Sequence, residues 1–306
     1  MALTKKQFDI LDVLAEEDSA LTQRQIEEKT GLSLGLINKT VKELTEMGFI
    51  NKSKITLSGL DALENYRVKR AIILAAGFGS RMIPLTFNTP KPLIRVHGQR
   101  IIDGQIDACL AAGIDEIYIV RGYLGEQFDQ LLYKYPMIKF IENPAYNDAN
   151  NISSMMCARY LLQNSYVFEA DILINSPKLI KRYQYQSNFL GFFCERTDDW
   201  CFEVENGFII NQSLGGLNCY QQVGVSYWNS FDGSKLSEDI NDDLAVIIVA
   251  PYKHLVEQWV EDIVKFNMKP IIAYGDPAHK DWRKKFSKAI TDQKIRKDKR
   301  FLCVVT

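Results

Sequence analysis

The sequence predicts an α/β domain that is preceded by a small, mainly helical domain. From residue 71 onward, short apolar runs alternate with helical patterns, which is typical of a sheet sandwiched by helices. Before that point, residues 1–66 contain short helical patterns followed by a strand–turn–strand pattern. A short basic linker, residues 64–70, separates the two sequence patterns. We therefore divide the chain into domains at 1–66 and 67–306.

Three helix patterns and a hairpin make up the small domain. The first helix has an apolar stripe over residues 8–14, the second begins after the N-cap candidate Thr22, and the third begins after Ser33. Residues 49–57 then follow as strand, turn and strand. This order resembles a winged helix-turn-helix domain of bacterial regulators. The resemblance implies that helix 33–46 enters the major groove of DNA, with Asn38, Lys39, Thr40 and Lys42 facing outward.

The charge of the small domain leaves its role open. Lys and Arg number 11 in residues 1–70, and Asp and Glu also number 11. A neutral module attracts DNA weakly, because phosphate contacts supply much of the affinity. Two roles therefore remain: sequence-specific DNA binding through residues 33–46, and dimerisation or another protein interaction.

Composition restricts the compartment and the partners. Lys and Arg total 37 against 38 for Asp and Glu, so the net charge of -1 draws the chain to neither nucleic acid nor membrane. The six cysteines contain no C-x-x-C pair and are typical of free thiols in a reducing compartment. The N-terminus has no secretory pattern, and the longest apolar stretch, 245–250, is too short to cross a bilayer. We expect a soluble cytoplasmic protein without a membrane partner.

The strands of the α/β domain are predicted in order along the chain. Residues 71–75 form an all-apolar run that ends at a glycine-rich turn, as a buried parallel strand does. Further strands are predicted at 117–120, 138–141 and 166–168, with a helix at about 105–112 between the first two strands. Ligands bind at the carboxyl ends of such strands, so the turns there are the first places to look for function.

The turn after the first strand carries phosphate-binding chemistry. Gly77 and Gly79 lack side chains, so backbone N–H groups can approach phosphate oxygens there. Arg81 can clamp a triphosphate, and Lys91 lies between two prolines that hold its ammonium near the α-phosphate. The run is neither a dinucleotide-binding fingerprint nor a Walker loop, because the third glycine and the Gly-Lys-Ser/Thr are missing. Taken alone, the two glycines also fit a purely structural turn.

Residues 74–93 as a whole are more specific than the two glycines. They resemble the signature of the nucleotidyltransferases that activate sugar 1-phosphates and phosphocholine, and every fixed position matches. The resemblance implies a Rossmann-like, three-layer α/β/α domain with a mixed sheet, and transfer of a nucleotide with Mg²⁺ as cofactor. It assigns nucleotide binding to Leu74, Ala75, Ala76, Gly77, Gly79, Arg81 and Asn151, and catalysis to Lys91, Arg81 and Asp171.

Carboxylates supply the predicted metal site. The strand at 166–168 delivers Glu169 and Asp171, which period-two spacing places on one face. Hard oxygen ligands of this kind suit Mg²⁺ between phosphates, although a solvated strand end would look similar. The related phosphocholine enzymes carry a Trp-Asp pair further along, where this chain has shifted acids. We assign the second metal ligand to Glu261 first and Asp262 second, and the shift leaves a non-catalytic relative open.

The middle of the domain bears on the acceptor. Residues 146–154, 198–202 and 224–228 resemble the bacterial CTP:phosphocholine cytidylyltransferases of cell-surface decoration. That resemblance implies transfer of CMP from CTP to phosphocholine, giving CDP-choline and pyrophosphate. A trimethylammonium group is best held by aromatic faces and an acid. We assign substrate contacts to Trp200, Tyr227, Trp228 and Glu169, with Asp198 or Asp199 adding charge; each aromatic also fits an ordinary core position.

Other functions remain compatible with the sequence. The acceptor could be a sugar 1-phosphate, or a primary amine such as 2-aminoethylphosphonate, which would prefer more acid and fewer aromatic walls. The chain could also be a DNA-binding regulator whose nucleotidyltransferase-like domain senses a metabolite, or an assembly module without a ligand.

Overall fold

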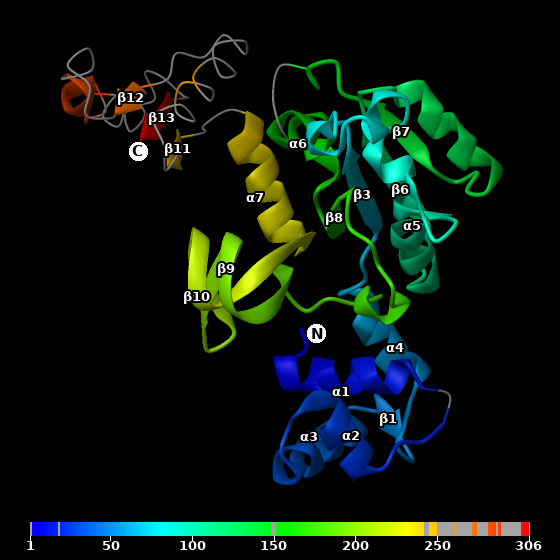
Figure 1. Cartoon of the computed structure of the whole chain (residues 1–306). Coiled ribbons are helices and arrows are strands. Elements are labelled where there is room, and N and C mark those ends of the chain that lie inside the picture. The colour runs from blue at the N-terminus through cyan, green and yellow to red at the C-terminus, as the bar shows by residue number, and fades with distance from the viewer. Residues whose placement is uncertain are drawn as a thin grey trace.

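The computed structural model contains a small helical domain joined to a larger α/β domain (Figure 1). The structure describes residues 2–17, 19–147, 151–241, 245–249, 257, 260, 271–273, 281–285, 287–288 and 301–305. Within these residues, no helix is long and apolar enough to span a membrane.

The small domain has the predicted winged helix-turn-helix order. Its elements are α1 (Lys5–Ala15), α2 (Gln23–Thr30), α3 (Leu34–Glu46), β1 (Ile50–Asn51), β2 (Lys54–Ile55) and α4 (Leu57–Glu64). The Thr22 side chain accepts from the backbone N–H of Gln25, whose side chain accepts from the N–H of Thr22, so the predicted cap is confirmed. Ser33 occupies the N-cap of α3, but its side chain makes no capping hydrogen bond.

The larger domain is built on a six-stranded mixed sheet. Its order is β7 (Lys139–Glu142), β6 (Glu116–Arg121), β3 (Arg70–Ala75), β8 (Ser165–Glu169), β10 (Phe208–Trp228) and β9 (Asn188–Glu205). The first four strands are parallel, β10 is antiparallel to β8, and β9 is antiparallel to β10. This confirms the predicted α/β class and the mixed sheet.

Helices cover both faces of this sheet. Successive side chains of the buried strand β3 point to opposite faces, so β3 contributes to the core on each side. Ile73 faces a core that includes Ile102 and Ile106 of α5 (Ile101–Ala111). Ile72 faces a second core shared with α6 (Asn151–Ala158) and α7 (Ser230–Asn241). A fully apolar strand is what burial on both faces requires.

Short elements complete the domain. The 3₁₀ segments are η1 (Ser80–Met82), η2 (Leu85–Phe87), η3 (Lys91–Leu93), η4 (Gly125–Tyr133), η5 (Arg159–Leu161) and η6 (Pro177–Leu179), and β4 (Arg95–Val96) pairs with β5 (Gln99–Arg100). Near the C-terminus, β11 (Ala245–Val249), β13 (Phe301–Val305) and β12 (Ile271–Ala273) form a parallel three-stranded sheet.

The β9–β10 hairpin is long and folds back on itself. Tyr220 of β10 pairs with Phe202 and also with Phe193 of β9, through a series of register shifts. Bulges of this kind bend a strand and increase its twist. Cys194 and Cys219 are cross-strand partners in this hairpin, and the sulfur atoms of their free thiols lie 3.9 Å apart. The predicted free thiols are therefore seen at these two positions.

The small domain packs against the segment that leads into β9. The backbone N–H of Gln184 donates to the Tyr66 carbonyl at 2.9 Å, and the Tyr183 hydroxyl donates to Glu64 at 2.8 Å. Tyr183 is buried in the hydrophobic core of the small domain. This docking lies at the side of the sheet where β3 begins, whereas the turns predicted to carry function follow the strand ends on the other side (Figure 1).

Candidate active site

The glycine loop follows β3 and is held tightly from behind. Gly79 has a φ of +63°, a left-handed conformation that favours glycine. A β-carbon there would lie 3.0 Å from Thr86 Cγ2 and 3.2 Å from Lys91 Cβ. The Thr86 hydroxyl donates to the Gly79 carbonyl at 3.0 Å, and the Tyr123 hydroxyl donates to the Thr86 carbonyl at 3.0 Å. The loop is therefore fixed before any ligand arrives.

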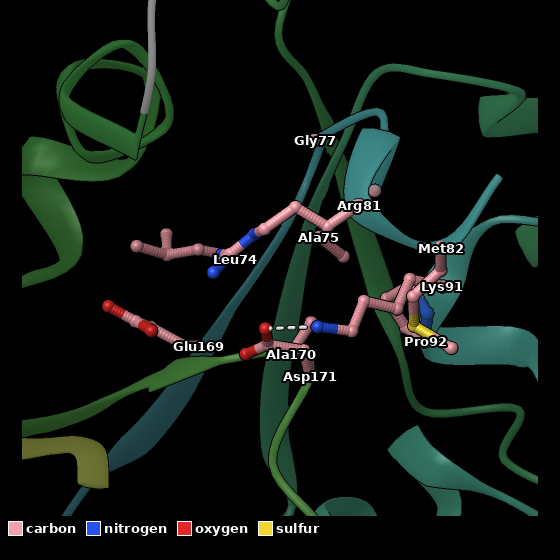
Figure 2. A pocket seen from close by; sticks show the side chains of 11 residues that line it. Leu74, Ala75, Gly77, Arg81, Met82, Lys91, Pro92, Glu169, Ala170 and Asp171 are labelled. Atoms are coloured by element: carbon pink, nitrogen blue, oxygen red, sulfur yellow. Dashed lines mark hydrogen bonds and ion pairs between the residues drawn. The ribbon is translucent and has the colours of Figure 1, made fainter. Parts of the chain in front are cut away.

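Lys91 begins the 3₁₀ segment η3 directly after Pro90. Its Nζ lies 2.6 Å from Oδ2 of Asp171, as the dashed line in Figure 2 marks. The ion pair joins the loop after β3 to the turn after β8, two segments separated by 80 residues in the sequence. Figure 2 also shows the Arg81 side chain reaching across the cavity above this pair, towards Glu169.

Glu169 and Asp171 lie on a tight turn at the carboxyl end of β8. Asp171 lies two residues beyond Glu169, the last residue of the strand, so it reaches the cavity through the turn and not through the predicted strand alternation. The backbone N–H of Ala170 donates to the Leu74 carbonyl at 3.2 Å, which ties the turn to β3. Burial raises the pKa of Glu169, and the negative charges of Asp171 and Asp199 raise it further. The positive charges of Lys91 and Arg81 act on the same pKa in the opposite direction, so three acids and two basic side chains share this region.

These segments enclose a cavity of about 210 Å³ (Figure 2). It is lined by Leu74, Ala75, Gly77, Gly79, Arg81, Met82, Lys91, Pro92, Glu169, Ala170 and Asp171. The structure thus brings together every predicted catalytic residue and most of the predicted nucleotide contacts. Within the described part of the chain, no aromatic side chain lines this cavity.

Two predicted nucleotide contacts, Ala76 and Asn151, are not among the residues that line the cavity. Ala76 is buried, and its carbonyl accepts a hydrogen bond from the Tyr123 N–H at 3.1 Å, so its backbone supports the loop. Asn151 is the first residue of α6, and its side chain lies outside what the structure describes.

Two predicted aromatic contacts do not fit their place in the structure. Because β10 runs antiparallel to β8, Tyr227 pairs with Tyr166 and Trp228 with Ser165, at the opposite end of β8 from Glu169. Tyr227 is 1% exposed and packs edge-on against Tyr166 at 5.5 Å. The Trp228 Nε1–H donates to Ser226 at 3.0 Å. Both are framework residues, so the expectation that they wall the substrate site is corrected.

Trp200 is placed differently from these two. It lies on β9 next to Asp199, whose Oδ1 accepts from the Trp200 N–H at 2.8 Å, and its side chain is 46% exposed. Trp200 does not line the cavity, but its neighbour Asp199 acts electrostatically on Glu169. Asp198 points into solvent beside Arg196.

The carboxylates are suited to a hard divalent cation. Asp171 faces the cavity beside Glu169, whose pKa is raised first by burial and then by the charges of Asp171 and Asp199; a bound cation would offset this repulsion between the acids. Over the described ranges, no three His, Cys, Asp or Glu side chains gather as a complete metal site. The predicted second ligands, Glu261 and Asp262, lie outside the described residues. Phosphate oxygens of a bound nucleotide would supply further ligands.

Gly224 is a site residue that the sequence reasoning missed. It has a φ of +72°, and a β-carbon there would lie 2.9 Å from Oε2 of Glu169. Its absent side chain therefore makes room for the carboxylate. A glycine inside a strand pattern signals such a close approach, and that signal was present in the sequence.

Comparison with known proteins agrees with this geometry. The family model for nucleotidyl transferases matches residues 70–139, and a winged helix-turn-helix DNA-binding model matches residues 3–51. Over 182 residues the chain is 38% identical to a 2-aminoethylphosphonate cytidylyltransferase from Lancefieldella rimae, covering 58% of this chain and 74% of that protein. Over 207 residues it is 31% identical to a choline-phosphate cytidylyltransferase from Streptococcus pneumoniae, covering 67% and 87%.

A solved structure shares the fold. It is that of the CTP:phosphocholine cytidylyltransferase from Streptococcus pneumoniae, with a TM-score of 0.53 and 34% identity over 57% of this chain and 76% of that one. The chain belongs to the cytidylyltransferase family of nucleotidyltransferases.

Proposed function

We propose that the protein transfers CMP from CTP to a small acceptor with a phosphate or phosphonate at one end and an amine at the other. The observation that carries this proposal is the cavity where the glycine loop, Lys91 and Asp171 meet. Backbone N–H groups of the loop would bind the triphosphate. The acids around Glu169 would then attract an amine.

The proposed reaction is a direct displacement. The described cavity lining contains no Ser, Cys or His that could act as a nucleophile. An oxygen of the acceptor's phosphate or phosphonate would therefore attack the α-phosphorus, and the bond to the bridging oxygen would break to release pyrophosphate. Positioning and charge stabilisation would carry the rate. A nucleotide with a chiral thio-substituted α-phosphate should react with inversion; net retention would contradict a single displacement.

Lys91 and Arg81 would stabilise the charge that develops during this step. Lys91 is held by the Asp171 carboxylate at 2.6 Å, and Arg81 reaches over the same space. Mg²⁺ held at Asp171 would neutralise charge between the α- and β-phosphates. When a nucleotide occupies the cavity, Lys91 can exchange its carboxylate partner for a phosphate oxygen, because it is a flexible point charge.

For the acceptor, we propose a primary amine such as 2-aminoethylphosphonate in preference to phosphocholine. A quaternary ammonium prefers aromatic walls, and the described lining has carboxylates but no ring. A primary ammonium can instead donate hydrogen bonds to Glu169 and Asp199. Phosphocholine remains the second candidate because Trp200 stands beside Asp199 and is exposed.

One experiment tests the reaction and the acceptor together. The full chain is incubated with CTP and Mg²⁺, and pyrophosphate release is measured separately with 2-aminoethylphosphonate, phosphoethanolamine, phosphocholine and glucose 1-phosphate. We expect release with the amines, fastest with a primary amine. If the protein instead prefers phosphocholine, and Trp200→Leu abolishes that preference, the result would support a substrate site with an aromatic wall at Trp200. A preference for the sugar would contradict the proposed acceptor class, and no release with any acceptor would contradict the enzyme function.

For the small domain, we propose DNA binding through residues 33–46 and the adjoining hairpin. Asn38, Lys39 and Lys42 lie exposed on one side of α3, and Lys52 is exposed on the β1–β2 turn. Thr40, which was also expected to face outward, is instead buried on the inner side of α3. Clustering of this kind supplies phosphate contacts even in a domain without net charge.

Fluorescence anisotropy with a labelled DNA duplex tests this proposal. Binding should weaken as salt rises, and a double substitution of Lys39 and Lys42 with Gln should weaken it further. The matched control is Lys134→Gln, an exposed lysine of the other domain. Absence of salt-sensitive binding, together with sedimentation of the full chain as a homodimer, would assign this face to self-association instead.

A further inference from the structure

One buried side chain supports the carboxylate turn from below. Gln105 of α5 is 0% exposed, and its Nε2 donates to the carbonyl of Glu169 at 2.9 Å and to that of Ile172 at 2.9 Å. Since both neighbours are acceptors, the orientation of the amide is determined by its surroundings. The two carbonyls flank Ala170 and Asp171, so Gln105 closes the turn that presents Asp171.

The same side chain contains an unfavourable atom. Its Oε1 is buried, and among the described residues it is the single buried side-chain N or O atom without a hydrogen-bond partner. Native proteins rarely leave such an acceptor unpaired, because its hydration is lost without replacement. An apolar side chain of similar length would avoid this loss. The two donated hydrogen bonds therefore point to a need at the turn, beyond filling the core.

That need follows from where Asp171 lies. The sheet ladder ends at Glu169, so no strand pairing holds Asp171, and the Ala170 N–H to Leu74 carbonyl bond holds the turn from one side. Gly104 of α5 lets the helix approach closely, because a β-carbon there would lie 2.9 Å from the Ile174 carbonyl oxygen. The helix and Gln105 together fix the other side. The position of a ligand for Mg²⁺ must be accurate, because this cation demands near-ideal octahedral geometry.

We propose that Gln105 is a positioning residue that sets the Asp171 carboxylate for the metal and for Lys91, acting through the backbone of the turn. The proposal rests on the proposed function, since it assumes that Asp171 binds the metal. Gln105 itself touches neither nucleotide nor acceptor: it lies beneath the turn and does not line the cavity. Residues that orient metal ligands in this way commonly change metal affinity by about 10- to 100-fold when substituted.

Gln105→Met tests the proposal, because it keeps the length of the side chain and deletes both donors together with the unpaired oxygen. Loss of the unpaired Oε1 should favour the folded state, but the carbonyls of Glu169 and Ile172 lose their donor, so we expect a lower urea midpoint in a variant that still folds. We also expect Mn²⁺ to bind about tenfold more weakly or worse. Free Mn²⁺ is measured by its electron paramagnetic resonance signal, in the presence of a CTP analogue with a methylene bridge. Turnover should fall with the metal affinity, and more Mg²⁺ should restore part of it.

The control is Ile106→Val on the same helix. Ile106 is also fully buried but belongs to the hydrophobic core and makes none of the hydrogen bonds to the turn. It should lose stability and keep the Mn²⁺ affinity of the unsubstituted protein. Because a structural role alone would move stability and not metal binding, the two variants should separate the two roles.

The remaining outcomes separate a failure of this proposal from a failure of the proposed function. If Gln105→Met does not fold, Gln105→Leu also removes the donors and places no charge in the core. If neither variant folds, NMR of the unsubstituted protein decides. The Gln105 side-chain amide protons should exchange slowly and shift when Mg²⁺ and the analogue are added. Unchanged Mn²⁺ affinity in a folded Gln105 variant, or indifferent amide signals, would overturn the proposal. An unsubstituted protein that binds no Mn²⁺ and releases no pyrophosphate would overturn the proposed function instead.

Discussion

The two glycines of the loop have different structural environments, and substituting each with alanine should separate folding from nucleotide binding. At Gly77 the φ lies outside the left-handed region, and a β-carbon would meet nothing within 4 Å. At Gly79 the φ is +63°, and a β-carbon would press on Thr86 Cγ2 at 3.0 Å and Lys91 Cβ at 3.2 Å. One substitution therefore fills open space in the cavity, and the other strains the backbone and moves the predicted catalytic lysine.

The magnitudes follow from these environments. A left-handed conformation costs a non-glycine residue about 1–2 kcal/mol, so Gly79→Ala should lower the free energy of unfolding by at least that amount. Gly77→Ala should raise it by about 0.4–1 kcal/mol, because alanine restricts the unfolded chain and fits the native conformation. The two variants should thus differ by roughly 1.5–3 kcal/mol in stability.

Nucleotide binding should respond in the opposite order. The methyl group of Gly77→Ala would stand where a phosphate meets the backbone, and a hydrogen bond to a charged group is worth about 1.5–3 kcal/mol. The dissociation constant for CTP should therefore rise by about 10- to 100-fold. Gly79→Ala should lower kcat more than it changes CTP binding, because it displaces Lys91.

Urea unfolding, calorimetric titration with CTP and steady-state rates measure these three quantities. If Gly77→Ala binds CTP as tightly as the unsubstituted protein, the loop does not approach the phosphates and the nucleotide lies elsewhere. If Gly79→Ala unfolds at the same urea concentration as Gly77→Ala, the strain argument is wrong.

Four other predictions concern charged groups of the same molecule. Lys91→Ala and Arg81→Ala should each lower turnover by about 10² to 10³ without changing the circular dichroism spectrum, and near-normal turnover in both would contradict their roles. Asp171→Asn should remove metal-dependent activity, since the amide keeps the shape but drops the charge; turnover that still titrates with Mg²⁺ would place the ligand elsewhere. Because the pKa of Glu169 is raised in the folded protein, ionisation of this carboxyl reduces stability as the pH rises through its folded-state pKa. Glu169→Gln should therefore unfold at a higher urea concentration at neutral pH, and it should also raise KM for the amine. Burial raises the pKa of Asp12 to about 6, against the opposing charge of Lys181. Asp12→Asn should therefore stabilise the protein above pH 6 by up to about 3 kcal/mol and have little effect below pH 4, as urea unfolding at the two pH values would measure.

The loop and the carboxylates could be predicted from sequence because their chemistry is local. A buried apolar strand followed by Gly77, Gly79 and Arg81 places phosphate-binding groups at a strand end whatever the rest of the chain does. Lys91 needs one long-range step, the parallel pairing of β3 with β8, which brings it to Asp171. The strand pattern supplies that pairing as well, so these residues were found together.

The aromatic contacts could not be predicted in this way, because their place depends on register. Tyr227 and Trp228 stand in a motif that also contains Gly224, which does approach Glu169. Antiparallel pairing with β8 carries each following residue about 3.4 Å further from the strand end. Residues three and four places after Gly224 therefore reach the far end of β8. Sequence spacing alone fixes neither the direction nor the partner of β10.

Gln105 was hidden for a related reason. In the sequence it is one of three polar residues, with Asp103 and Asp107, in an otherwise mainly apolar helical segment, and such residues usually face solvent. Its burial depends on the tight approach at Gly104 and on a turn 64 residues away. A polar residue next to a glycine on an otherwise apolar helix face is a weak signal, and only the packing gives it meaning.

The attachment of the small domain also depends on packing that the linker does not reveal. The chain from Asp171 to β9 passes through residues 180–185, and this segment docks on the small domain. Tyr183 completes that domain's core, and Tyr185 stacks on Tyr66 at 5.5 Å. The same segment continues into β9, which carries Asp199 towards Glu169. Any shift of the small domain must therefore either break these contacts or move the start of β9. The boundary at residue 66 divides the sequence into two patterns, but the two domains share buried surface.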